Sequence, residues 1–177
     1  MLKIVQTPNK VLHTPVKEIK IIDARIKKIV QQMEETLVAQ VDPQGVGLAA
    51  PQVGLSLALF IIKPTPKART ETYINPKIIA STPIKEKDVK KGDKIKMEGC
   101  LSIYNVWAPV ARSQDVTLSY LDLLGRPHEK EFKGFHAVIV QHEMDHLQGV
   151  LFTARALEQG QDFYEEVKGE LVKKKGI

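Results

Sequence analysis

Apolar residues recur at helical spacing in two long stretches of the chain. Between residues 23 and 41, isoleucine, valine, methionine and leucine repeat every three or four positions, which is typical of an amphipathic helix packed on a core. Asp23 can cap this helix, and Asp42-Pro43 is expected to end it. The second stretch begins after Gly134 and is expected to stop at Gly149. The pattern therefore predicts one early packing helix and one late helix.

The late helix is predicted to be apolar around nearly its whole circumference. At 100° per residue, two faces are formed by Phe135, Val138, Ile139, His142 and His146, and by Ala137, Val140, Met144 and Leu147. A helix of this kind is expected to be buried. The two histidines continue an apolar face and need partners, because burying an unpaired polar group is costly.

Elsewhere the pattern favours short strands between turns. Strands are expected at residues 55–62, 72–74, 105–112, 116–120 and 128–132. Pro8 and Pro15 argue against a helix in residues 3–20, which are expected to be extended. The lysine-rich residues 81–96 are predicted to form an exposed hairpin. A short terminal helix is predicted to carry Phe163, Val167 and Leu171 on one face.

Composition narrows the class of protein. The chain has 177 residues, of which 43% are hydrophobic and 27% charged, so we expect a single domain spanning residues 1–177. No apolar run approaches membrane-spanning length, and the N-terminus lacks the apolar region of a secretory signal. These features predict a cytoplasmic protein without membrane contact. The net charge of +5 is compatible with an RNA surface, but simple solubility is the better explanation for so small a charge.

The candidate chemistry is concentrated in the sequence His-Glu-Met-Asp-His at residues 142–146. Two histidines one helical turn apart can bind a single metal ion, and Glu143 between them can carry a proton for a metal-bound water. The pattern is a known zinc-hydrolase motif. The alternative is a surface helix with two unrelated histidines, and the apolar surroundings argue against it.

The chain has one cysteine, Cys100, so no intramolecular disulfide can form. A lone cysteine is usually an inert small hydrophobe, but beside a two-histidine site it is also the obvious third ligand. Three protein ligands with one open position are typical of a catalytic metal. Such a set accepts zinc, iron, nickel or cobalt.

Three segments, in their order and separation, resemble peptide deformylase, the enzyme that removes the formyl group from newly made bacterial proteins: Gly45–Gly54, Glu98–Ser102 and Gln141–Gly149. The resemblance implies an α+β fold with antiparallel β-sheets packed around a central buried helix that carries the histidine motif. It also implies a metal bound by Cys100 with the two histidines. Ferrous iron would be the native ion, and Zn²⁺, Ni²⁺ or Co²⁺ could replace it.

The resemblance further implies roles for individual residues. Glu143 would be the general acid/base, and Gln52 with the backbone N–H of Leu101 would form the oxyanion hole. Val46 and Gly47 would hold a formyl-methionyl nascent peptide as an added strand. Metal-bound water would attack the formyl carbon and release formate.

The methionine of such a substrate requires an apolar pocket beside the metal. Phe135, Val138 and Ile139 share the helix face of the histidine ligands and are candidates to line it. Ordinary core packing is an equally good explanation for any one of them.

The end of the chain suggests a further partner. Lys168 and Lys173–Lys175 form a basic tail that could contact ribosomal RNA, although Glu165, Glu166 and Glu170 would weaken the attraction. No contact with DNA is expected. Tyr104 stands where many members of the family have proline, which would affect the shape of the neighbouring loop.

Two other classes of protein share part of the pattern. A zinc peptidase would use the same histidine motif, but its third ligand is more often a carboxylate or a histidine. A structural metal domain or a silent ribosome-binding protein would need a fourth ligand or would lack a catalytic group. Glu143 and Gln52 are both present, which argues against this last class.

Overall fold

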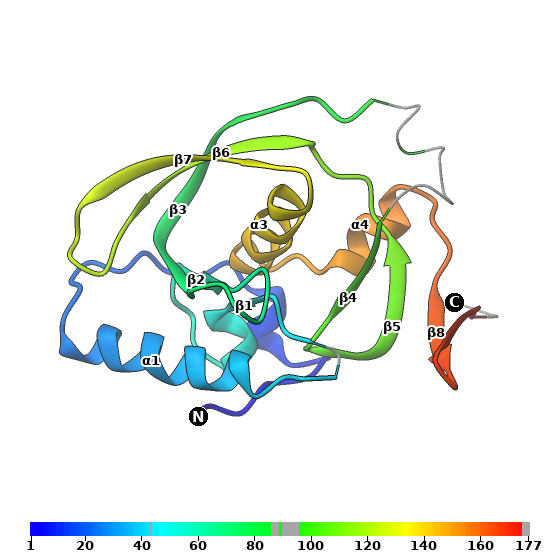
Figure 1. Cartoon of the computed structure of the whole chain (residues 1–177), viewed down its shortest axis with the longest axis horizontal. Coiled ribbons are helices and arrows are strands. Elements are labelled where there is room, and N and C mark those ends of the chain that lie inside the picture. Colours follow the sequence, from blue (N-terminus) through cyan, green and yellow to red (C-terminus); the bar gives the residue numbers. More distant parts are fainter. Residues whose placement is uncertain (43, 86–88, 90–95, 175–177) are drawn as a thin grey trace.

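The computed structural model describes residues 1–42, 44–85, 89 and 96–174. Its strands form two antiparallel sheets (Figure 1). The five-stranded sheet has the order β1 (Gly47–Ala49), β2 (Leu59–Ile62), β3 (Glu71–Ser81), β6 (Asp115–Leu121) and β7 (Pro127–Lys133). The four-stranded sheet has the order β4 (Met97–Cys100), β5 (Ile103–Pro109), β8 (Tyr164–Val167) and β9 (Glu170–Lys173).

The predicted combination of helices with antiparallel sheets is confirmed. Helix α3 (Phe135–Leu147) lies between the strands of the two sheets, with β3, β6 and β7 curving over one side and β4 and β5 on the other (Figure 1). Helix α1 (Ala24–Val38) runs along the outside beneath β1 and β2, and α4 (Phe152–Glu158) lies beside β5. Among the described residues, no helix is both long and apolar enough to cross a membrane.

Helix α1 follows its predicted pattern closely. The Asp23 side chain accepts a hydrogen bond from the backbone N–H of Ile26, at 3.0 Å, and so caps the first turn. Met33 and Leu37 are buried in a cluster with β1 and β2. The helix ends at Val38 rather than at residue 41, because the chain turns through residues 39–42 before it enters β1.

Helix α3 is buried, as its sequence predicts. The face that carries Ala137, Val140, Met144 and Leu147 packs on the five-stranded sheet. Gly149 follows the helix with a φ of 73°, a backbone conformation that ends a helix readily. Because the sheet covers that face, the face that carries His142 and His146 is directed toward β4.

Strand β3 is longer than predicted. It continues through Asn75-Pro76 to Ser81, beyond the end predicted at residue 74. Asn75 adopts a φ of 49°, and the register with β6 shifts between Ile74 and Lys77. Such a bulge accommodates proline, since a bulged residue needs no ladder N–H. The Asn75 side chain also bonds both backbone groups of Ile19, at 2.8 and 2.9 Å, which stabilises the irregular conformation.

Two predictions near the N-terminus need correction. Residues 3–20 include a 3₁₀ helix, η1, at Lys10–His13, between the two prolines and capped by the side chain of Asn9. The strand expected at residues 55–62 is only β2, Leu59–Ile62. Most of the exposed hairpin predicted at residues 81–96 lies outside the described residues.

The predicted terminal helix is wrong. Residues 164–173 form the β8–β9 hairpin, in which Val167 pairs with Glu170 across Lys168 and Gly169. Both turn residues have positive φ, 52° and 84°, which suits a tight hairpin turn and is incompatible with a continuous helix. Phe163 is buried as an anchor for this segment, whereas Val167 and Leu171 are exposed. Helix α4, which precedes the hairpin, was not predicted.

Candidate metal centre and active site

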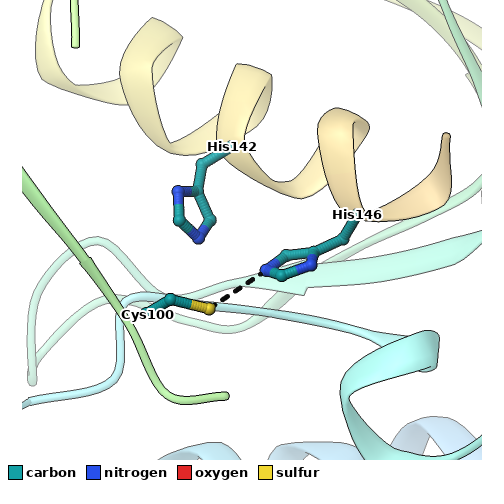
Figure 2. Close-up of side chains that lie close together, drawn as sticks. All are labelled: Cys100, His142 and His146. Atoms are coloured by element: carbon teal, nitrogen blue, oxygen red, sulfur yellow. Dashed lines mark hydrogen bonds between the residues drawn. The ribbon is translucent and has the colours of Figure 1, made fainter. Parts of the chain in front are cut away.

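Three potential metal ligands converge between β4 and α3. Cys100 ends β4, and His142 and His146 extend from successive turns of α3 toward it (Figure 2). Their ligand atoms all lie within 4.8 Å of one another, and Cys100 Sγ is 3.2 Å from His146 Nε2. One sulfur and two imidazole nitrogens suit a divalent transition metal, so the residues present fit such an ion.

A buried carboxylate orients one of the histidines. Glu98 Oε2 accepts a hydrogen bond from His142 Nδ1 at 2.9 Å. Because Nδ1 is used in this way, Nε2 of the same ring is directed toward the cysteine and is available for a metal. Sequence reasoning did not identify Glu98 as part of the site.

Glu98 belongs to a network of charged side chains. Arg112 donates to both oxygens of Glu98, at 2.8 and 2.9 Å, and to Asp145 at 2.6 Å. Arg155 on α4 donates to the other oxygen of Asp145 at 2.8 Å. Burial by itself would raise the pKa of Glu98, but the hydrogen bonds from Arg112 and His142 outweigh it and lower the pKa to about 2. The carboxylate is therefore charged, as an orienting acceptor must be.

The sequence contained a signal for this network. Glu98 and Asp145 each lie inside one of the family-like segments, next to apolar residues, and a buried acid requires a basic partner. The partner, Arg112, could not be identified, because many other arginines and lysines occur in the chain.

Glu143 lines the pocket next to His142. Its side chain is almost fully buried, and its Oε2 atom has no hydrogen-bond partner among the described residues. Burial, reinforced by the nearby charge of Glu98, raises the pKa of Glu143 to about 7, although His142 opposes the shift. A carboxyl group with a pKa near neutrality can both accept and donate a proton.

The close approach of β1 to Glu143 requires a glycine. A Cβ atom added to Gly47 would lie 2.3 Å from Glu143 Oε1. A larger residue would therefore displace either the strand or the carboxyl group. Gly47 and the glutamate of the histidine motif are thus sterically coupled, although they are 96 positions apart in the sequence.

Gln52 directs its amide toward the cysteine. Its Nε2 donates to Cys100 Sγ at 3.4 Å, and its Oε1 accepts from the backbone N–H of Ala49 at 2.8 Å. The second bond fixes which end of the amide faces the site. Leu101 lines the same pocket, and its carbonyl accepts a hydrogen bond from Gln6 at 2.9 Å.

One pocket of about 220 Å³ is lined by Gln52, Cys100, Leu101, His142 and Glu143. All of the residues suggested for substrate binding line it: Val46, Gly47, Phe135, Val138 and Ile139. Met97 and Trp107, which sequence reasoning did not single out, also line the pocket. Phe135 is 44% exposed beneath Lys96, whose Nζ lies 4.8 Å from the ring centre, so this pair lies at the surface.

Comparison with known proteins shows the family of this chain. The family model described as Polypeptide deformylase matches residues 1–162. The chain belongs to the polypeptide deformylase family. Members of this family are metal-dependent enzymes that remove the N-formyl group from nascent peptides. The prediction that the chain is an enzyme of this family is therefore confirmed.

Individual deformylases match over most of their length. The chain is 39% identical to the peptide deformylase of Borreliella burgdorferi, over 97% of this chain and 93% of that protein. The structure of the Legionella pneumophila deformylase aligns with a TM-score of 0.77 and 33% identity, over 88% of this chain and 85% of that one. The Synechococcus elongatus enzyme, solved in complex with actinonin, aligns with a TM-score of 0.75 and 37% identity, over 90% and 82%.

Proposed function

We propose that this chain removes the formyl group from the N-terminal methionine of newly synthesised proteins, as one catalytic domain acting in the cytoplasm on nascent chains. The observation that carries the proposal is the convergence of Cys100, His142 and His146 beside the buried Glu143, whose Oε2 has no hydrogen-bond partner in the described part of the chain. Cys100, His142 and Glu143 line an apolar pocket beside the central helix α3, and His146 lies one helical turn beyond His142.

In the proposed site, Cys100, His142 and His146 hold one divalent metal. When bound, the metal supplies Lewis-acid polarisation of the formyl carbonyl and lowers the pKa of water. We propose ferrous iron as the native ion on the basis of the family resemblance. Zn²⁺, Ni²⁺ and Co²⁺ suit the same mixture of sulfur and nitrogen donors.

The protein groups carry the proton and stabilise charge. Glu143 accepts a proton from the attacking water and delivers it to the leaving amine, so that the formyl C–N bond breaks and formate and a free N-terminus are produced. The Gln52 amide and the backbone N–H of Leu101 stabilise the negative charge that develops on the formyl oxygen. Each such donor typically lowers the barrier by about 3 kcal/mol.

The substrate backbone is proposed to bind between two sheet edges. β1 and β4 are edge strands of the two different sheets, and residues from both line the pocket. An extended peptide can therefore add as a strand beside Val46 and Gly47. Its methionine side chain would occupy the apolar lining formed by Phe135, Val138 and Ile139.

The test is formate release from formyl-Met-Ala-Ser, compared with acetyl-Met-Ala-Ser, using protein prepared without oxygen and analysed for metal. We expect activity on the formyl peptide alone and one metal per chain. Cleavage of an internal peptide bond would indicate a peptidase instead. Stoichiometric metal without any hydrolysis would indicate a structural metal domain.

Contact with the ribosome through the basic end of the chain is a separate proposal. Lys168 and Lys174 carry positive charge at the β8–β9 hairpin and beyond it, which suits phosphate. Lys173 is already paired with Asp162 at 2.6 Å, which reduces the charge available. Lys175 lies outside the described residues.

A further inference from the structure

Among the described strands, β7 forms the longest free edge of a sheet. It has seven residues and ends the order β1-β2-β3-β6-β7, so in the described part of the chain it pairs only with β6. The other end strands, β1, β4 and β9, have three or four residues each. The register of β7 with β6 runs through all seven residues, whereas that of β3 with β6 is shifted twice. A long, regular edge presents backbone groups to which another strand can pair.

Hydrogen bonds at the two ends of the β6–β7 pair show which backbone groups face outward. At one end, the N–H of Gly134 donates to the Gln114 carbonyl at 2.8 Å. At the other end, the N–H of Asp122 donates to the Arg126 carbonyl at 3.0 Å. Since every second residue of an antiparallel pair bonds the neighbouring strand, both bonds assign the even-numbered residues of β7 to β6. The N–H and carbonyl groups that point away from β6 therefore belong to Glu129, Glu131 and Lys133.

The side chains of these three residues carry both signs of charge. Phe132 is buried in the core, and side chains alternate along a strand, so Glu129, Glu131 and Lys133 lie together on the opposite face. All three are exposed. Lys133 pairs with Glu131 within the strand, at 3.1 Å. Along the edge the charges are negative, negative and positive, so they do not repel every strand that could approach.

A second copy of this chain fits the edge in an antiparallel register with a two-fold axis at Glu131. In this register Glu129 lies opposite Lys133 of the second copy, and Lys133 lies opposite its Glu129. Each pair of opposite residues can exchange both of its backbone hydrogen bonds, because both residues direct these groups outward. Pro127, which has no N–H, lies outside the paired segment.

Neighbouring registers are less favourable. An axis at Lys130 would place Glu129 opposite Glu131 on both sides, and like charges directly opposite are destabilising. It would also bring Pro127 into the paired segment, where a backbone bond would be lost on each side. An axis at Phe132 would pair only the last three residues of each strand. The axis at Glu131 has one like-charge contact, at its centre, and there each glutamate keeps the lysine of its own strand at 3.1 Å.

We infer that two copies of this chain pair through β7 in this register, so that their five-stranded sheets join into one continuous sheet. The partner is a second copy because the charges of the edge are complementary to themselves under a two-fold rotation, whereas a strand of uniform charge would meet repulsion. β1, whose Gly47 lines the pocket, is at the other end of the sheet, so the pocket stays open in the dimer. A contact confined to one edge is small, and the dimer is therefore in equilibrium with the monomer.

The experiment measures the mass of the full chain by sedimentation equilibrium at low salt over a series of protein concentrations. We expect the wild-type chain to pass from monomer to dimer as its concentration rises. Glu129→Lys places lysine opposite lysine on both sides of the axis, and Lys133→Glu places glutamate opposite glutamate. Each substitution should raise the dissociation constant about tenfold or more, because two attractive exposed pairs become repulsive.

Mixing the two variants makes the test specific for the register. A dimer of one Glu129→Lys chain and one Lys133→Glu chain again has lysine opposite glutamate on both sides of the axis. The mixture should therefore dimerise although each variant alone does not, and a chain that carries both substitutions should dimerise with itself. Glu34→Lys and Lys28→Glu are the matched controls, because they make the same charge changes on the exposed surface of α1. Both should keep the wild-type dissociation constant.

Each outcome decides for or against the inference. A wild-type chain that stays monomeric at every concentration refutes it, and the charges of β7 then serve to keep the edge free. A dimer that survives both single substitutions, or that the controls on α1 weaken equally, also refutes it, because the contact then lies elsewhere. Loss of the dimer in each variant with recovery in the mixture establishes the pairing, since misfolded chains would not recover on mixing.

Discussion

At the scale of single residues, Glu143 should be essential for turnover but not for metal binding. Its carboxyl group is buried, and one of its oxygens has no hydrogen-bond partner among the residues that the structure describes. Glu143→Gln therefore keeps the shape of the side chain and removes its capacity to carry a proton. We expect activity to fall by about 10²- to 10⁴-fold, with metal content unchanged by elemental analysis. Near-normal formate release would contradict the proposed acid/base role.

Gly47 allows a second test of the same carboxyl group. Gly47→Ala places a methyl group 2.3 Å from Glu143 Oε1, well inside van der Waals contact, unless the structure adjusts. We expect a large loss of activity in the wild-type background, measured as kcat/KM. In the Glu143→Gln background the added loss should be small, because the displaced group no longer carries the proton. Equal losses in both backgrounds would mean that the substitution impairs binding of the substrate backbone beside β1 and does not act on Glu143.

At the scale of secondary-structure elements, the buried ion network joins β4, α3 and α4. Arg112→Leu would leave Glu98 and Asp145 buried with fewer cationic partners. Removing one partner from a buried ion pair typically costs about 3–5 kcal/mol. We expect a loss of this size in the free energy of unfolding, measured by urea denaturation, together with weaker metal retention because Glu98 orients His142.

Arg126→Leu is the matched control for that prediction. Arg126 also pairs with an aspartate, Asp122, but on the exposed surface. Because water and salt screen such a pair, its loss should change stability far less. Similar denaturation midpoints for the two variants would show that the buried network contributes no more to stability than an exposed ion pair does.

At the scale of the whole molecule, the C-terminal hairpin lies far from α1, at the opposite end of the view in Figure 1. If the basic end of the chain contacts ribosomal RNA, Lys173→Glu with Lys174→Glu should reduce co-sedimentation with ribosomes at low salt. The control is the same charge change at Lys27 and Lys28, which are exposed on α1. An equal reduction by both pairs would reflect net charge alone.

The sequence by itself determined the local features of this chain. The burial of α3 on nearly all sides, the cap of α1 at Asp23 and the stop at Gly149 follow from residue spacing and backbone preference. The two histidine ligands could also be identified from the sequence, because residues four positions apart share a helix face independently of the rest of the fold. Local geometry governs each of these features, so local sequence predicts them.

Only the tertiary structure decided the features that depend on distant partners. The segment around Phe163 has helical spacing, yet it forms a hairpin because β5 offers an edge on which β8 can pair. Strand β3 continues past Pro76 because Asn75 is held by the backbone of Ile19. The choice of Arg112 as the partner of Glu98, and the need for glycine at residue 47, arise from contacts between segments far apart in the chain. Such contacts depend on how the elements pack, and no local pattern of residues encodes that packing.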